Sequence, residues 1–385
     1  MAKFALLIGV SEYSEGLRPI SSAILDVEAM RRVLEHPDMG AFDQVTVLSN
    51  PDKGSMEKAV EVLFANRQKD DLVLLYFSGH GLKAQNARFF LSTRETGRDQ
   101  NGDFRRATAL AATKLQEYIT DSHSQRQIII LDCCFSGALV AGMPIKGELN
   151  IQEELGGKGR AILTSSSPIE YSFESEDEDN DLSIYTKYLV EGIETGAADQ
   201  DGDQLISVNE LHEYASERVK EAAPAMTPKF YLSLEGEDTI YLARSPLAAN
   251  DPKFKYRKIV EDIIKKWNDE DIKDYCFKEE DFSAADRAVL DATIDQLNLS
   301  PDEARTIETE VLNPLLRRRD NIKKYRNAFR KIIAAANHTP LKNKDRESLK
   351  KLQIIYGLRD EDIQFIEKKV KASLMEKILH FIKTL

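Results

Sequence analysis

Two short segments each place a reactive side chain directly after an apolar run. "LVLLYFSGHG" (72–81) ends with His80, and "IIILDCCFSG" (128–137) carries Cys133 and Cys134 before a Ser-Gly turn. The thiolate is the nucleophilic form of cysteine, and it needs a nearby base or a positive environment. His80 is the one histidine of six that ends an apolar run. The two segments therefore predict a Cys-His dyad across two strand ends.

The two adjacent cysteines are expected to differ in their surroundings. Because side chains alternate along a strand, one cysteine points into the core and the other faces the crevice above the strand end. Gly79, Gly81 and Gly137 permit tight turns and close backbone approach beside the reactive residues. The alternative is a buried cysteine pair and an unrelated structural histidine. The presence of both segments in one chain favours the dyad.

Residues 1–245 supply the elements that would hold these side chains. Apolar runs predict strands at 3–10, 44–49, 71–79, 126–134 and 160–167, and helical spacing predicts helices at 23–35, 55–67, 115–121, 184–196 and 208–223. The segments 230–234 and 240–244 are expected to finish this domain as strands. Such alternation predicts an α/β fold whose mostly parallel sheet is covered by helices on both faces. Functional groups in such sheets gather at the carboxyl ends of the strands.

The charge distribution divides the chain into two parts. The 385 residues carry a formal net charge of -12, whereas residues 251–385 hold 29 Lys/Arg and 25 Asp/Glu and are net positive. A length of this size favours two domains. The segment 246–254 is rich in small and polar residues and prolines, which predicts a linker. Residues 255–385 are expected to form a separate, all-α domain.

This helical part contains an internal repeat. Residues 286–312 align with 345–371 at an offset of 59, and the segments 256–264 and 325–333 resemble each other as lead helices. Coinciding residues include Leu290/Leu349, Leu299/Leu358, Ile307/Ile366, Glu308/Glu367 and Val311/Val370. Each unit is expected to hold a lead helix, a second helix, a short turn and a third helix. The expected role is that of a scaffold for partner binding or regulation.

The paired motifs resemble a known family. The chain is similar to the caspase-like cysteine peptidases, and within them to the bacterial metacaspase or orthocaspase group. The resemblance rests on "FALLIGVSEY" (4–13), "YFSGHG" (76–81), "DCCFSG" (132–137) and "LVEGIETGAAD" (189–199), and it covers about residues 1–245. It implies a caspase-like fold and a thiol protease. The animal signature Gln-Ala-Cys-x-Gly is absent, so cleavage after aspartate is not implied.

The resemblance also implies a role for each matching residue. Cys134 takes the position of the family's nucleophile, which leaves Cys133 to pack. His80 takes that of the general base for the thiol and of the acid for the leaving amine. The backbone N–H groups of Gly81 and Cys134 would form the oxyanion hole.

A second implication concerns the residue before the scissile bond. Asp26 matches the family's acidic position that, together with the aspartate of the cysteine motif (Asp132), binds a basic side chain. Two carboxylates in one pocket need a cation between them, which Arg or Lys would supply. Cleavage after Arg or Lys is therefore expected, with Ser78 also lining the pocket. The alternative for Asp26 is a helix N-terminal residue that interacts with the helix dipole.

The segments that follow the cysteine motif carry further charge. Glu170 and Glu174 are candidates for additional negative charge at the substrate pocket. The acidic run 174–183 is expected to be a solvated loop, with guarding of the site as the alternative. Lys146, in "MPIKGELN", is the candidate for autocleavage by an enzyme that cuts after basic residues.

Residues 199–211, "DQDGDQLISVNEL", match a calcium-binding loop at its first, third, fifth and twelfth positions. These are Asp199, Asp201, Asp203 and Glu210. Gln204 occupies the sixth position, where the loop normally has glycine. The segment is a candidate site for Ca²⁺, and a plain acidic connector is the alternative. No cofactor is expected to be required for the chemistry.

The remaining features bound the class of protein. Three cysteines cannot form a disulfide framework, and no apolar run reaches the length of a membrane span, so a cytoplasmic protein is expected. The net negative charge argues against general nucleic-acid binding. The basic stretch 317–331 is expected to be a solvated face, with an acidic protein partner as the alternative. The competing hypothesis for the whole chain is a catalytically silent adaptor that acts through its helical repeats.

Overall fold

The computed structural model describes the chain except for residues 15, 85–87, 101, 134–150, 166–181, 225, 234–238, 247–250, 268–281, 336–340 and 385. Backbone contacts divide the chain into two compact units. The first comprises most of residues 1–249, and the second comprises Arg218–Ala225 and Asn250–Leu385, apart from a short segment outside the described residues. Each unit is described separately below.

The described part of the first unit contains a sheet of six strands in the order β10-β8-β7-β3-β1-β2. The parallel members are β1 (Lys3–Gly9), β2 (Gln44–Ser49), β3 (Leu72–Ser78), β7 (Arg126–Asp132) and β8 (Arg160–Thr164). Strand β10 (Lys229–Ser233) pairs antiparallel with β8 at one edge. All seven residues of β3 are buried, as expected of a central strand covered on both faces. The predicted fold class is confirmed.

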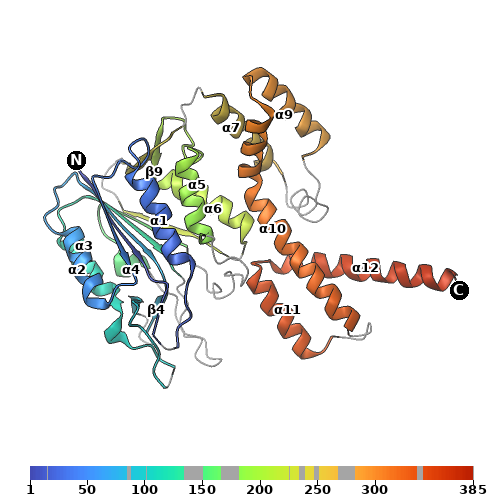
Figure 1. Ribbon diagram of the computed structural model, residues 1–385, viewed down its shortest axis with the longest axis horizontal. Coiled ribbons are helices and arrows are strands. Elements are labelled where there is room, and N and C mark those ends of the chain that lie inside the picture. Colours follow the sequence, from blue (N-terminus) through green and yellow to red (C-terminus); the bar gives the residue numbers. More distant parts are fainter. Residues whose placement is uncertain are drawn as a thin grey trace. The chain divides into compact units, whose positions relative to one another are not determined.

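Helices cover both faces of this sheet (Figure 1). Helices α2 (Lys53–Phe64), α3 (Ala112–Asp121) and α4 (Ile151–Leu155) join the core cluster that includes Phe77 and Leu131. Helices α1 (Ser22–Glu35), α5 (Ile184–Glu194) and α6 (Val208–Ala222) lie on the opposite side. The alternate strand residues, such as Tyr76 and Ser78, face α1 and α5 and bond to their side chains.

Short elements that the sequence patterns did not predict complete the unit. Strands β4 (Gly81–Lys83), β5 (Phe89–Leu91) and β6 (Leu110–Ala111) form an antiparallel sheet, with a 3₁₀ turn at Arg106–Thr108. Strand β11 (Tyr241–Arg244), which was predicted at 240–244, pairs with the unpredicted β9 (Leu205–Ser207) rather than with the main sheet. Runs of two or three residues are too short for a period-2 pattern to identify.

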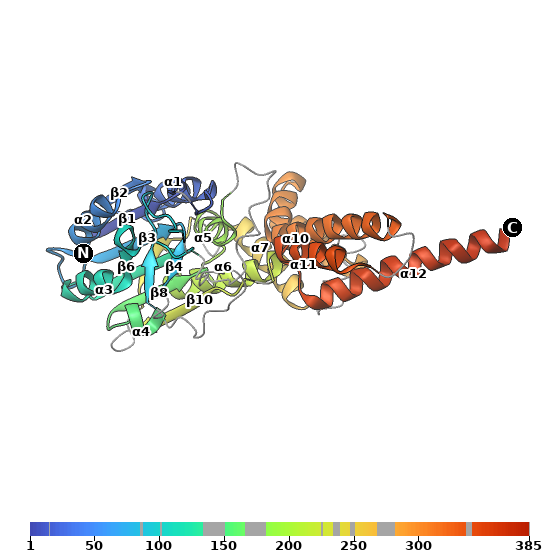
Figure 2. The same cartoon turned by 90° about the horizontal axis from the view of Figure 1, so that it is seen from below.

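The second unit is helical in its described part. Its helices are α7 (Pro252–Lys265), α9 (Ala284–Leu297), α10 (Pro301–Ala335), α11 (Asn343–Ile355) and α12 (Asp360–Thr384). Helix α7 begins inside the segment predicted as a linker, because Asp251 caps it and proline suits the first helical position. Figures 1 and 2 both show α11 and the first part of α12 against α10.

Coinciding residues of the repeat share one core, and one predicted helix boundary is absent. The coinciding pairs Leu290/Leu349, Ile307/Ile366 and Val311/Val370 are all buried in one core cluster. The third helix of the first repeat and the lead helix of the second were predicted as separate helices. They are instead one continuous helix, α10, of 35 residues. Asn313-Pro314 is a sequence signal that usually interrupts a helix, yet α10 continues through it, with the one hydrogen bond missing that the proline cannot donate.

One polar contact recurs in both repeats. Tyr256 in the first lead helix donates to Glu308 (2.5 Å), and Tyr325 in the second donates to Glu367 (3.4 Å). Glu308 also accepts two hydrogen bonds from Arg287. Burial and the neighbouring glutamate raise the pKa of both tyrosines, which keeps both as hydrogen-bond donors.

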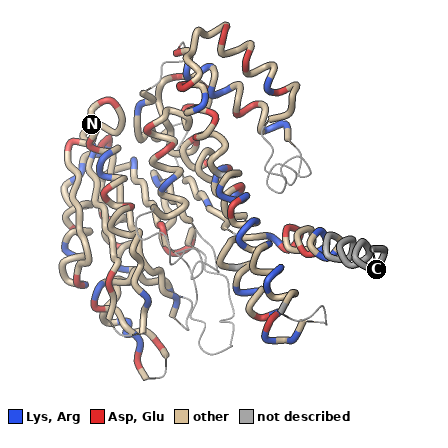
Figure 3. Tube along the Cα trace, turned by 45° about the vertical axis from the view of Figure 1, so that its right-hand side comes forward, with Lys and Arg blue, Asp and Glu red and all other residues tan. Residues whose placement is uncertain are grey.

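The basic stretch 317–331 is not a uniformly solvated face. Arg318 is 3% exposed and binds Asp362 (3.0 Å) and Glu221, so part of the stretch belongs to a buried ion-pair network. Lys323, Lys324, Arg330 and Lys331 are exposed. Figure 3 shows basic and acidic residues interspersed along the helices of this unit. Among the described residues, no helix combines the length and apolar character that a membrane span requires.

Candidate active site

His80 comes two residues after Ser78, the last residue of the central strand β3, and its backbone is held by a tyrosine. Its backbone N–H donates to the hydroxyl of Tyr13 (3.0 Å), which in turn donates to the carbonyl of Val10 (2.5 Å). The two rings lie 4.6 Å apart between centroids. Tyr13 thus connects the ends of β1 and β3 and fixes the backbone on which the histidine stands.

The hydrogen bonding of His80 assigns its tautomer. Its Nε2 lies 2.8 Å from the carbonyl oxygen of Arg18, and a carbonyl can only accept, so Nε2 carries the proton. In the neutral ring, Nδ1 is then the basic nitrogen. Burial lowers the pKa of His80, opposed by the bond to Arg18 and assisted by the charge of Arg98. The side chain is therefore a neutral imidazole at pH 7, which is the form that a general base requires.

The cysteine segment follows the neighbouring strand in the same register. Ser78 of β3 pairs with Asp132 of β7, and His80 and Cys134 each come two residues after this pair. Neighbouring strands lie about 4.8 Å apart, so both motifs start from the same place at the carboxyl edge of the sheet. Cys133 is buried in the core cluster with Leu131. Cys134, Lys146, Glu170 and Glu174 lie outside the described residues.

The two aspartates expected in a substrate pocket are both buried at this edge. Asp26, on α1, is fully buried and accepts from the Ser78 hydroxyl (2.9 Å) and from the Ser183 backbone N–H (2.8 Å). These bonds, rather than a helix dipole, define its surroundings, since Asp26 lies beyond the first turn of α1. Ser78 lies beside Asp26, and its role in a substrate pocket stays a prediction.

Asp132 is held by the start of helix α5. Its Oδ2 accepts from the hydroxyls of Ser183 and Thr186, the latter at 2.6 Å. Ser183 is the N-cap of α5, and its hydroxyl also accepts from the Thr186 N–H. Tyr76 extends the network by bonding to the Thr186 hydroxyl (2.6 Å). The positive end of the helix dipole thus faces both carboxylates.

Burial and mutual repulsion perturb the pKa values around this pair of carboxylates. Burial, and secondly the charge of Asp132, raises the pKa of Asp26 well above its usual range. Burial and the same carboxylates raise the pKa of Tyr76. Among the described residues, no Lys or Arg pairs with either aspartate. A cation placed between these carboxylates would relieve the repulsion and the cost of burial together.

Sequence patterns missed three residues of this site. Tyr13, Ser183 and Thr186 bond across 51 to 67 positions of the chain to the residues they support, and such contacts leave no periodic signal. Two weaker signals exist. Tyr13 ends the "FALLIGVSEY" motif, and Ser183 is a serine directly before a helical pattern, which is an N-cap signature.

Gly81 begins β4 and pairs with Leu91 of β5. This pairing fixes the backbone next to His80, because the Ser92 N–H also donates to the His80 carbonyl (3.0 Å). The proposed oxyanion role of the Gly81 N–H stays a prediction.

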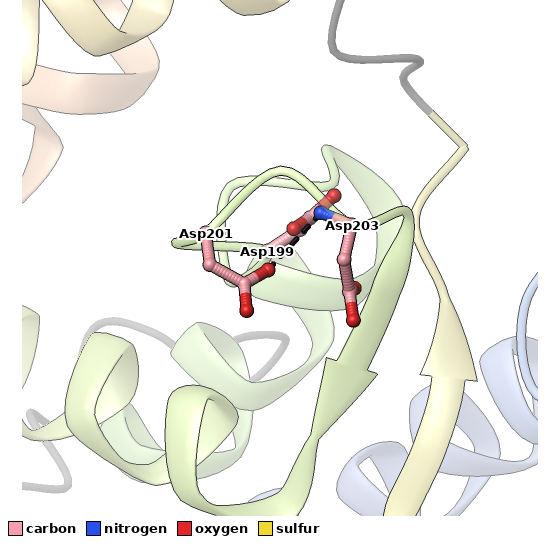
Figure 4. Close-up of side chains that lie close together, drawn as sticks. All are labelled: Asp199, Asp201 and Asp203. Carbon is pink, nitrogen blue, oxygen red and sulfur yellow. Dashed lines mark hydrogen bonds between the residues drawn. The ribbon is translucent and has the colours of Figure 1, made fainter.

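The acidic loop between α5 and α6 brings three carboxylates together. Figure 4 shows Asp199, Asp201 and Asp203, whose ligand oxygens lie within 4.8 Å of one another. Gln204 adopts a positive φ of 71°, the conformation for which a calcium loop normally uses glycine. Burial raises the pKa of Asp199, opposed by bonds from the N–H groups of Gly202 and Gln204.

Glu210, the fourth candidate ligand of this loop, makes hydrogen bonds to the loop backbone. Glu210 accepts from the backbone N–H groups of Gln200 (3.0 Å) and Ser207 (2.9 Å), and from the Ser207 hydroxyl (2.8 Å). These bonds connect the two ends of the loop. Calcium binding here stays a prediction.

Comparison with known proteins identifies the family of this fold. The family model described as "Caspase domain" matches residues 2–237. A crystal structure of a protein from Geobacter sulfurreducens aligns with a TM-score of 0.44 and 16% identity, over 64% of this chain and 99% of that one. No curated protein matches the chain. Because the family model spans more than half of the sequence, including both motifs, the chain belongs to the caspase-domain family of cysteine peptidases.

Proposed function

We propose that this protein is a cysteine endopeptidase that cleaves after Arg or Lys with a His80–Cys134 dyad. The observation that carries the proposal is the buried pair Asp26 and Asp132: Asp132 ends β7, and Asp26 on α1 accepts from Ser78, which ends β3 two residues before His80. An acidic pocket next to a neutral histidine suits a peptide whose basic side chain is anchored while its carbonyl is attacked.

The chemistry follows from the assigned tautomer. Nδ1 of His80 accepts the thiol proton of Cys134, and the sulfur attacks the carbonyl carbon of the scissile bond. Backbone N–H groups of Gly81 and Cys134 would stabilise the oxyanion of the tetrahedral intermediate. His80 then returns the proton to the leaving amine, which gives a thioester. Water, deprotonated by the same histidine, hydrolyses the thioester and restores the thiol.

The choice of a basic residue rests on charge. Both carboxylates accept hydrogen bonds, yet none of these donors carries a positive charge. A guanidinium or ammonium group supplies both donors and charge, and so lowers the pKa of Asp26 back toward its usual range. An aspartate or leucine side chain would leave the two buried carboxylates uncompensated.

Hydrolysis of matched fluorogenic peptides tests this function. Peptides that differ only in Arg, Lys, Asp or Leu before the scissile bond are assayed with the full chain, with Cys134→Ala and with His80→Ala. We expect turnover of the Arg and Lys peptides alone, reduced at least about 10³-fold in either variant. Turnover of the Asp peptide alone would contradict the pocket assignment. No turnover of any peptide would favour the catalytically silent adaptor.

The helical unit is proposed to recruit or regulate. The described part of this unit carries exposed basic residues on α10, including Lys323, Lys324 and Arg330, which suit an acidic protein partner. Cytoplasmic location and partner binding stay predictions.

A further inference from the structure

The ends of three neighbouring strands place polar side chains in one row. Ser78 of β3 is in register with Asp132 of β7, and Leu131 of β7 is in register with Thr164 of β8. The N–H of Ser165 donates to the Leu131 carbonyl (3.2 Å), so the ladder continues one residue beyond the strand. Ser165 therefore stands next to Asp132, about 4.8 Å away along the row.

Alternation assigns the face on which Ser165 lies. Leu131 belongs to the core cluster beneath α2, α3 and α4, so its partner Thr164 shares that face. Asp132 and Ser165 each follow by one residue and take the opposite face, which carries Ser78 and Asp26. The row thus reads hydroxyl, carboxylate, hydroxyl on the face of the sheet that carries Asp26.

Ser165 differs from the other hydroxyls of this pocket. Ser78, Ser183 and Thr186 all donate to a carboxylate. Ser165 is completely buried, and its hydroxyl has no hydrogen-bond partner within the described parts of the chain. An unsatisfied buried hydroxyl destabilises a protein unless something else supplies its partner, so it marks a place where a ligand can donate.

We propose that Ser165 is a substrate-binding residue of this pocket, whose hydroxyl accepts from an arginine guanidinium and favours Arg over Lys before the scissile bond. The inference rests on the proposed function and adds to it the choice between the two basic residues. A guanidinium brings five N–H donors in a planar fork, whereas an ammonium brings three on one atom. The two carboxylates can satisfy an ammonium, but the wider fork needs a further acceptor, which Ser165 offers beside Asp132.

Binding, rather than turnover, tests this inference most directly. Calorimetry is carried out with full-length Cys134→Ala protein and two peptides that differ only in Arg or Lys at the position before the scissile bond. We expect the Arg peptide to bind more tightly than the Lys peptide. Adding Ser165→Ala should weaken the Arg peptide about tenfold and change the Lys peptide by less than about twofold.

Thr164→Val supplies the matched control. Thr164 is the adjacent residue, is equally buried and also has a hydroxyl without a partner among the described residues, but it lies on the opposite face. This variant should leave both affinities unchanged. Melting temperatures of both variants should equal or exceed that of the parent, because each removes an unsatisfied hydroxyl.

The possible outcomes distinguish a failure of the Ser165 role from a failure of the proposed acidic pocket. An unchanged Arg affinity in Ser165→Ala, or an equal loss for both peptides, overturns the role of Ser165 while the basic pocket stands. Failure of the Cys134→Ala parent itself to bind either peptide overturns the acidic pocket, and the role of Ser165 with it.

Discussion

The first unit contains two groups of carboxylates, and they are built in opposite ways. Asp26 and Asp132 accept mainly from side-chain hydroxyls and from residues 51 to 157 positions away. Asp199, Asp203 and Glu210 accept from backbone N–H groups two to ten positions away. Hydroxyls can rotate toward a new partner, whereas backbone donors of a closed turn cannot. The first group is therefore suited to exchange ligands, and the second to hold a loop.

The largest effect is expected from a variant that removes one carboxylate of the Asp26–Asp132 pair. We expect Asp26→Asn to lower kcat/KM for an Arg peptide about 10²–10³-fold, because a buried cation loses a charged partner. The raised pKa of Asp26 means that ionised Asp26 destabilises the fold once the pH exceeds its unfolded value. The melting temperature at pH 7 should therefore stay constant or rise, even as activity is lost.

The matched control for this variant lies in the loop. Asp201 is exposed, and Asp201→Asn changes charge by the same amount without touching the pocket. Peptidase activity without added calcium should remain within about twofold of the wild type. An equal loss in both variants would mean that net charge, and not the pocket, sets the activity.

A buried histidine on α6 gives the next effect. His212, on α6, bonds to Tyr185 (2.9 Å) and Ser216 (3.0 Å), and burial lowers its pKa to about 4. Below pH 6.5 the unfolded chain binds a proton that the folded chain does not, so stability falls as the pH drops from about 6.5 to about 4. The total loss is about 3 kcal/mol.

Denaturant unfolding across this pH range measures that loss. His212→Gln should flatten the pH dependence of the free energy of unfolding, while His36→Gln, at an exposed position, should preserve it. If His212→Gln keeps the full slope, other groups must carry the acid sensitivity of this unit.

The pH dependence of turnover follows from His80. Because its pKa is lowered, the acid limb of kcat/KM for an Arg peptide should lie below pH 6.5 and fall about tenfold per unit. Measurement of the same profile in Asp26→Asn separates the histidine from the carboxylate pair. If the acid limb of kcat/KM shifts to another pH in Asp26→Asn, the titrating group belongs to the Asp26–Asp132 pair instead of being His80.

The smallest effect concerns calcium at the loop. An ion would have to compete with the bonds that Glu210 makes to the backbone, so weak, millimolar binding is expected. At about ten times the dissociation constant, Ca²⁺ should raise the melting temperature by about 3 °C, and Asp203→Asn should abolish the rise. An unchanged melting temperature would make the loop a connector only, and Mg²⁺ at equal ionic strength is the control.

The same contrast explains what the sequence could predict. The acidic loop and strand β2 (Gln44–Ser49) are each formed by residues that are close in sequence. Residue spacing alone therefore predicted the strand and the grouping of Asp199 with Asp203. The convergence of Asp26 and Asp132 came from motif resemblance, since no period links two residues on α1 and β7. Ser183 and Tyr13 act through folded geometry and were missed. The separate helices expected around residue 315 were wrong, because α10 continues through Asn313-Pro314, a dipeptide that usually interrupts a helix.

Helix α10 gives the repeat an unexpected mechanical property. At 1.5 Å per residue, its 35 residues extend over about 50 Å and belong to both repeats. Pro314 lies inside this helix, and because it has no backbone N–H, one helical hydrogen bond is missing near the repeat boundary. The two repeats therefore share one continuous backbone helix whose weakest point lies between them. Shortening the protein at the repeat boundary would cut this shared helix rather than remove a module.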